Sequence, residues 1–113
     1  MQDQRTHIIH HRTSEEQRTL GYRIVDASNG AVRVVCAETR CHPNDNFNKR
    51  VGRSHVENRL QSYLSGNRSE RLRAFEADIT IANPTNAKQF RELEQTLLLL
   101  ADYRLPTPAA IQS

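Results

Sequence analysis

Glycine and cysteine are scarce in this sequence, and each shortage argues against a class of function. With four glycines there is no Gly-rich phosphate loop, and no Ser/His/Asp or Cys/His arrangement stands in its place, so we expect no enzyme. The two cysteines, Cys36 and Cys41, lie five residues apart. Even with His42 and His55 added, this spacing matches no common zinc site, so we expect no metal and no cofactor.

Long apolar runs are also missing. No segment approaches the roughly 20 apolar residues of a membrane-spanning helix. The first residues, MQDQRTH, are polar and lack the apolar stretch of a secretory signal. We therefore expect a cytoplasmic protein with no membrane partner and with reduced cysteines.

Apolar and aromatic residues are few for a chain of this size. They make up 36% and 5% of its 113 residues, which is the length of one ordinary domain, so we assign 1–113 to a single domain. The core of a lone monomer would be thin. In addition, Leu97–Leu100 covers the whole circumference of a helix, so part of it should meet another subunit or element. We therefore expect a homo-oligomer.

Positive charge is present mainly as arginine. Only Lys49 and Lys88 are lysines, so 14 of the 16 cations are Arg, and the formal net charge is +3. Arginine offers a planar fork that suits phosphate and stacks on flat rings, which favours contact with a nucleotide; a codon bias toward Arg is an equally good explanation of the composition alone. Acidic residues interrupt any basic stripe, at Glu57, Glu70, Glu76 and Asp78, which argues against nucleic acid as a partner.

The first half of the chain has the pattern of a β-hairpin. Two runs rich in β-branched residues flank Asn29-Gly30, a dipeptide that readily supplies positive φ at both turn positions. A two-residue turn predicts the following opposite pairs: Asp26 with Arg33, Ile24 with Val35, and Tyr22 with Ala37. Residues 1–17 form either a polar segment or an edge strand, and we expect the histidines His7, His10 and His11 to be solvated.

The second half predicts two helices. The first runs over 46–64, is capped by Asn44 or Asp45, and stops at Ser65-Gly66-Asn67. Its stripe of Gly52, Val56, Leu60 and Tyr63 should face the sheet, with Phe47 and Val51 on the other side. Residues 73–82 fit a helix or a strand, and Ile79-Thr80-Ile81 before Asn83-Pro84 favours the strand.

The second helix begins after Thr85 or Asn86 and breaks at Pro106. One face carries Phe90, Leu93, Leu97, Leu100 and Ala101, with Leu98 and Leu99 outside it. Residues 106–113 should be a flexible tail. The sequence therefore predicts an α+β fold: a small antiparallel sheet, made of the hairpin and one or two further strands, packed with two α-helices.

Candidate ligand-binding residues gather at the start of helix 46–64. Backbone N–H groups and the two forks of Arg50 and Arg53 can hold a pyrophosphate, Phe47 can stack on a purine, and Asn46 can read its edge. The alternative is purely structural: Asp45 caps the helix, Phe47 anchors a small core, and the arginines are a solvated face. If the ligand does not bind at this site, the next candidate for ligand binding is the group of Arg71, Arg73 and Arg104.

The same stretch carries a resemblance to a known family. Its pattern Cys-x-Pro-x-Asp-x-Phe-x-Lys-Arg-x-Gly-Arg, which is Cys41 to Arg53 here, resembles small phage-encoded proteins of the first described Thoeris anti-defence family. The resemblance covers about residues 22–64, but Ser54-His55-Val56-Glu57 departs from the family's small apolar residues. It implies a sponge in the host cytosol that sequesters a cyclic nucleotide signal, a cyclic ADP-ribose isomer or a cyclic oligonucleotide, without cleaving it. The alternative is an inhibitor that binds a host protein or nucleic acid through its Arg-rich helix.

Overall fold

A four-stranded antiparallel sheet in the order β1-β2-β3-β4 organises the molecule. The computed structural model describes residues 5–12, 17–41 and 49–105. The elements are β1 (His7–Arg12), β2 (Gln17–Ser28), β3 (Ala31–Cys41), α1 (Lys49–Leu64), a 3-10 turn η1 (Glu70–Leu72), β4 (Ala74–Ile79) and α2 (Ala87–Arg104). The predicted α+β class is confirmed, and the suggested edge strand forms as β1.

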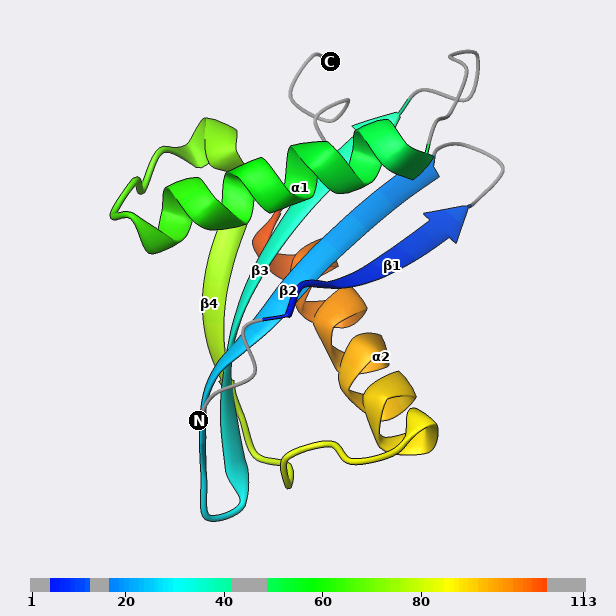
Figure 1. Cartoon of the computed structure of the whole chain (residues 1–113), viewed down its shortest axis with the longest axis vertical. Coiled ribbons are helices and arrows are strands. Elements are labelled where there is room, and N and C mark those ends of the chain that lie inside the picture. The colour runs from blue at the N-terminus through cyan, green and yellow to red at the C-terminus, as the bar shows by residue number, and fades with distance from the viewer. Residues whose placement is uncertain (1–4, 13–16, 42–48, 106–113) are drawn as a thin grey trace.

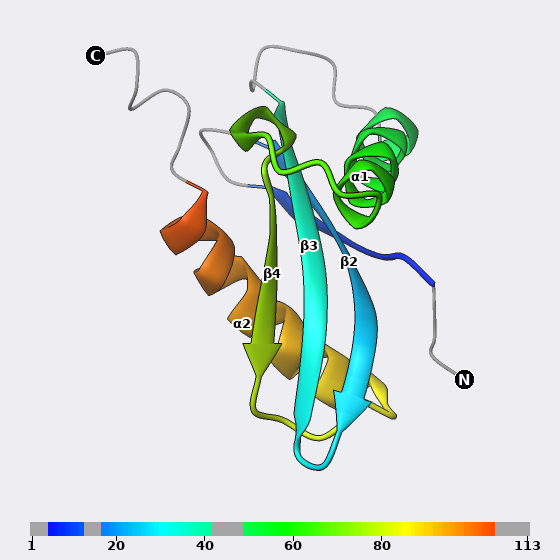
Figure 2. The ribbon, with the colours of Figure 1, turned by 90° about the vertical axis from the view of Figure 1, so that its left-hand side faces the viewer.

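The two helices cover opposite faces of the sheet. Figure 2 shows α1 and α2 on either side of the strands, with α1 near one end of the sheet. The main core lies between the sheet and α2, where Leu20, Tyr22 and Val34 pack against Leu93 and Leu97. A smaller cluster of Val35, Ala37 and Leu60 lies under α1. As Figure 1 shows, α1 crosses the strands rather than running along them.

The hairpin forms with the predicted two-residue turn, but most of the predicted register is wrong. Ser28 is opposite Ala31 and Asp26 opposite Arg33, as expected, and Gly30 has a φ of +73° whereas Asn29 has no positive φ. The ladder then shifts by one residue at a β-bulge, with Val25 as the unmatched residue.

This bulge changes the partners of the buried residues. Ile24 is opposite Val34 and Tyr22 opposite Cys36, not Val35 and Ala37 as predicted. Residues directly opposite each other lie on the same face of a sheet. Because of the bulge, Ile24 and Tyr22 lie on the face of the sheet that packs against α2, whereas Val35 and Ala37 face α1.

Helix α1 packs through the predicted stripe. Gly52, Val56 and Leu60 are buried, and Tyr63 is partly buried against the small cluster. A Cβ on Gly52 would lie 2.6 Å from Thr19 Oγ1, so glycine is what allows the helix to approach β2 this closely. The helix stops after Leu64, and Gly66 takes a φ of +109°. The predicted caps Asn44 and Asp45 lie outside the described residues.

The ambiguous segment is a strand, and the second helix is capped as predicted. Phe75, Ala77 and Ile79 alternate as buried residues along β4 because one side of the strand faces α2. Asn86 is the N-cap of α2, and its Oδ1 accepts from the Gln89 N–H at 3.0 Å.

The apolar face of α2 is wider than predicted. Leu93, Leu97 and Ala101 are buried, but Leu98 also packs against the core, so its expected place outside the face is wrong. Leu99 is 71% exposed, as predicted. The tail 106–113 lies outside the described residues. Within the described ranges, neither helix is both long and apolar enough to cross a membrane.

Candidate anion-binding site

The charged side chains of the sheet concentrate at one end, around the buried Glu38 of β3. One carboxylate oxygen, Oε2, accepts from Arg18 Nε at 2.9 Å and Nη2 at 2.5 Å. The other, Oε1, accepts from Arg40 Nε at 2.7 Å and Arg73 Nη2 at 2.8 Å. The Glu38 side chain is 0% exposed, so three guanidinium groups replace the water it would have in solution.

These hydrogen bonds govern how Glu38 ionises. Burial, the largest single influence, would raise the pKa of Glu38, but the hydrogen bonds from Arg40, Arg73 and Arg18 outweigh it and lower the pKa. Glu38 is therefore a carboxylate at neutral pH, and both of its oxygens accept hydrogen bonds from arginines.

Guanidinium groups outnumber carboxylates among the described residues of this cluster. Arg59 reaches the same residue from α1, where its Nη1 donates to the Glu38 carbonyl at 2.5 Å. On the other side, Arg18 Nη1 donates to Asp102 of α2 at 2.7 Å. Four guanidinium groups thus face two carboxylates within the described part of the chain.

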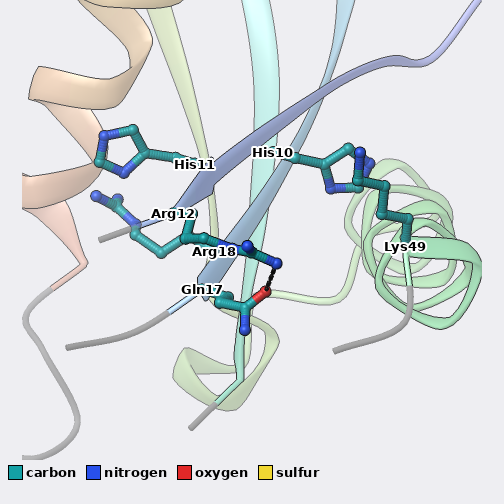
Figure 3. A pocket seen from close by; sticks show the side chains of 6 residues that line it. All are labelled: His10, His11, Arg12, Gln17, Arg18 and Lys49. Carbon is teal, nitrogen blue, oxygen red and sulfur yellow. Dashed lines mark hydrogen bonds between the residues drawn. The ribbon is translucent and has the colours of Figure 1, made fainter. Parts of the chain in front are cut away.

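A pocket of about 220 Å³ opens beside this cluster, where β1 ends, β2 begins and α1 starts. It is lined by His10, His11, Arg12, Gln17, Arg18 and Lys49, and we call it the first pocket. None of these described lining residues is acidic. Figure 3 shows His11 and Arg18 on the α2 side of the sheet, with His10 on the α1 side facing Lys49.

Two cations of the first pocket are not neutralised by a described carboxylate. Arg12 Nη2 donates to the neutral amide oxygen of Gln17 at 3.2 Å, drawn in Figure 3, and Lys49 has no ion pair within the described ranges. Lys49 is the first described residue of α1, and the first turn of that helix has no acidic residue. The positive end of the helix dipole adds to these two charges.

The two histidines of the first pocket also suit an anion. Burial lowers the pKa of His10, and the positive charges of Lys49 and Arg53 lower it further, because each disfavours a second positive charge. His11 Nδ1 is buried, and no described residue forms a hydrogen bond with it. An anion could accept a hydrogen bond from this nitrogen and would favour protonation of His10.

The predicted site is only partly represented in the structure. Asn46 and Phe47 lie outside the described residues. Arg50 and Arg53 are exposed on α1, where Arg53 Nε pairs with Glu57 at 2.9 Å, and neither arginine lines the first pocket. The positive charge of Arg53 nevertheless helps to lower the pKa of His10, which lines the first pocket.

Sequence reasoning missed most of the first pocket. We expected His7, His10 and His11 to be solvated, and His10 is exposed as predicted, although it also lines the pocket. The expectation was wrong for His11, whose Nδ1 is buried, and for His7, whose ring lies 4.9 Å from both Tyr22 and Phe90. The available signal was the short hairpin between residues 7–12 and 17–28: once β1 pairs with β2, its basic end must lie beside Arg18.

The arrangement can hold an anion but offers little for a metal. No group of three or more His, Cys, Asp or Glu side chains that could ligate a metal ion occurs among the described residues. Cys36 is buried in the main core, and burial raises the pKa of its thiol, which opposes formation of a nucleophilic thiolate.

Fold and pocket together define an α+β protein with a cationic pocket at one end of a four-stranded antiparallel sheet. No protein-family model matches the chain, and no curated protein or solved structure matches it either.

Proposed function

We propose that this protein binds and sequesters a phosphate-bearing cyclic nucleotide without cleaving it, as an anti-defence sponge would. The observation that carries this proposal is the first pocket, whose described lining residues supply positive charge and N–H donors but no carboxylate. Arginine, lysine and histidine beside a helix start form the usual environment of a bound phosphate.

The volume of the pocket sets which part of the ligand it accepts. At about 220 Å³ it is smaller than the roughly 300–1,000 Å³ of sites that enclose a drug-sized molecule. A phosphate group fits this space, while the rest of a nucleotide would extend over the rim toward Arg53 and Arg50. The sequence resemblance of the stretch from Cys41 to Arg53 supports the same ligand class.

A second copy of the chain would extend this shallow site. Several large apolar side chains are exposed, namely Val51 (48%), Leu64 (41%), Leu99 (71%) and Tyr103 (87%). Val51 and Leu64 belong to the helix that starts at the pocket, so an interface there would bring another subunit close to the ligand. We expect a homo-oligomer in sedimentation, and a 13.0 kDa monomer at micromolar concentration would contradict this part of the proposal.

The test is a calorimetric titration with cyclic ADP-ribose at two salt concentrations. Lys49→Gln and Arg12→Gln should each weaken binding about tenfold, because each removes a charge-assisted contact with phosphate. Lys88→Gln and Arg91→Gln are matched controls: they remove the same charges from exposed positions of α2 that line no described pocket.

Two outcomes would refute the proposal. Equal affinities for the pocket variants and for the α2 controls would mean that only net charge matters. Recovery of a hydrolysed ligand after incubation, read by mass spectrometry, would show an enzyme rather than a sponge. Recovery of the intact ligand, together with weaker binding at higher salt, is the expected result.

A further inference from the structure

A second pocket opens at the same end of the sheet but at its opposite edge, where β4 begins and α2 ends. It has a volume of about 460 Å³. The described residues that line it are Arg68, Ser69, Glu70, Arg73, Ala74, Arg104 and Leu105. Arg73 and Arg104 belong to the group that the sequence suggested as an alternative site, whereas Arg71 is not among the lining residues.

Two arginines of the second pocket are held in place by neutral partners. Arg68 Nη1 donates to the Tyr63 carbonyl at 2.6 Å, and its guanidinium lies 3.9 Å from the centroid of the Tyr63 ring. Arg104 Nη1 donates to the Glu76 carbonyl at 2.9 Å, and its guanidinium lies 5.7 Å from the Phe75 ring. Each contact fixes a guanidinium without cancelling its charge.

The charges of Arg68 and Arg104 are therefore available. Neither forms an ion pair with a carboxylate in the described part of the chain. A guanidinium has five N–H donors, and the hydrogen bonds of both residues with described partners use Nη1 alone. The donors on Nε and Nη2 can thus serve a bound oxyanion, with the side chain already ordered.

We propose that the second pocket is a distinct binding site for a small phosphorylated molecule. Its phosphate would pair with Arg68 and Arg104, with the Ser69 hydroxyl as a further donor, and its body would lie against Ala74 and Leu105. The volume suits this class because it exceeds that of a phosphate and lies within the usual range for small-molecule sites. This site does not depend on the function proposed for the first pocket.

A substitution of Glu70 should change the affinity for the ligand in the opposite direction from the arginine substitutions. It is an exposed carboxylate at the rim of the second pocket and should repel a phosphate, so Glu70→Gln should strengthen binding about two- to fivefold. Arg68→Gln and Arg104→Gln should weaken it about tenfold or more. Arg71→Gln, in the same 3-10 turn but outside the lining, removes an equal charge and should have no effect.

The experiment follows backbone amide signals of the full chain by NMR during titration with glycerol phosphate. Saturable shifts at residues 68–74, with affinities changed as stated, would support the site. The first pocket is followed separately through residues 10–12, 17–18 and 49, so failure there leaves this result intact.

Three results would overturn the site. One is the absence of saturation at millimolar concentrations; another is equal affinity of Arg68→Gln and Arg71→Gln. The third is equal binding of glycerol, which lacks the phosphate. If Arg104→Gln fails to fold, Arg68→Gln and Glu70→Gln still decide, because both side chains are exposed.

Discussion

The two faces of the sheet are packed in opposite ways. On the α2 face, large side chains such as Tyr22, Leu93 and Leu97 fill the space between helix and strands. On the α1 face, Gly52 meets Thr19 and Gly21 meets Val56, so the backbones approach each other closely and few large side chains lie between them.

Because of this difference, the α2 face serves mainly the stability of the fold, and the α1 face serves mainly to position the binding residues. Buried apolar volume is the main source of folding free energy, and most of it lies on the α2 face. The α1 face contributes less volume but fixes where the start of α1, and thus Lys49, lies relative to His10. Substitutions on the two faces should therefore differ in effect, most of all in the charged cluster around Glu38 at the end of the α2 face.

The largest loss of stability should follow from Glu38→Gln. The substitution leaves three arginines around a neutral amide, and removal of one partner from a buried ion pair costs about 3–5 kcal/mol. Urea unfolding at pH 7 measures this loss. Glu92→Gln, at an exposed position of α2, should be nearly neutral, and equal effects of the two would contradict the structural role of the cluster.

The effect of Glu38→Gln should depend on pH in a defined direction. The folded-state pKa of Glu38 is lowered, so its contribution is complete above its unfolded value of about 4.3 and is lost as the pH falls through the folded value. The stability difference between wild type and variant should therefore be constant near neutral pH and narrow in acid.

The next largest effect should distinguish the two apolar cores. Leu97 and Leu60 are both 0% exposed, and Leu→Ala at such sites costs about 2–5 kcal/mol. Leu97→Ala should fall in the upper half of this range because large neighbours surround it. Leu60→Ala should fall in the lower half, since its neighbours Ala37 and Ala74 belong to a small cluster. Unfolding in guanidinium chloride measures the loss of unfolding free energy for each variant. Equal losses would refute the division between the two faces.

A smaller loss is expected for Gly52→Ala. The added methyl group would lie 2.6 Å from Thr19 Oγ1 and 3.2 Å from Thr19 Cβ, and overpacking of this kind costs about 1–3 kcal/mol. The better helix propensity of alanine returns about 1 kcal/mol. We expect a net loss of up to about 2 kcal/mol by thermal unfolding. Ser54→Ala, on the exposed side of α1, should instead be neutral or stabilising.

The smallest change in stability should come from Arg53→Ala. Its pair with Glu57 joins exposed side chains four residues apart on a helix, which is worth about 0.3–0.5 kcal/mol. Binding of cyclic ADP-ribose should nevertheless weaken at least about tenfold if Arg53 contacts the ligand phosphate. Glu57→Gln breaks the same pair but keeps the cation, so it should retain binding. Equal affinity of wild type and Arg53→Ala would remove Arg53 from the site.

The elements of the fold could be predicted because local patterns determine them. Alternation of buried residues identified β4, and Asn86 marked the start of α2. The bulge at Val25 could not be predicted, since Val34 and Val35 are both apolar and either could face the core. The pattern alone does not choose between these two registers.

The candidate site was harder to predict than the fold. Lys49 lies in the stretch from Cys41 to Arg53 that suggested a ligand site, but its neighbours in the first pocket, His10 and Arg12, come from a strand far away in the sequence. Their meeting depends on how α1 lies across the sheet, and two glycine contacts fix that position. No local pattern encodes such a long-range arrangement.

Glu38 has a further consequence if both pockets bind anions. Arg18 lines the first pocket and Arg73 the second, and the two are held by different oxygens of this one carboxylate. An anion that attracts Arg18 away from Glu38 leaves more of the carboxylate's charge to hold Arg73. If Arg73 also contacts the anion of the second pocket, the pockets share a counter-ion and bind with negative cooperativity, each ligand lowering the affinity of the other by the same factor.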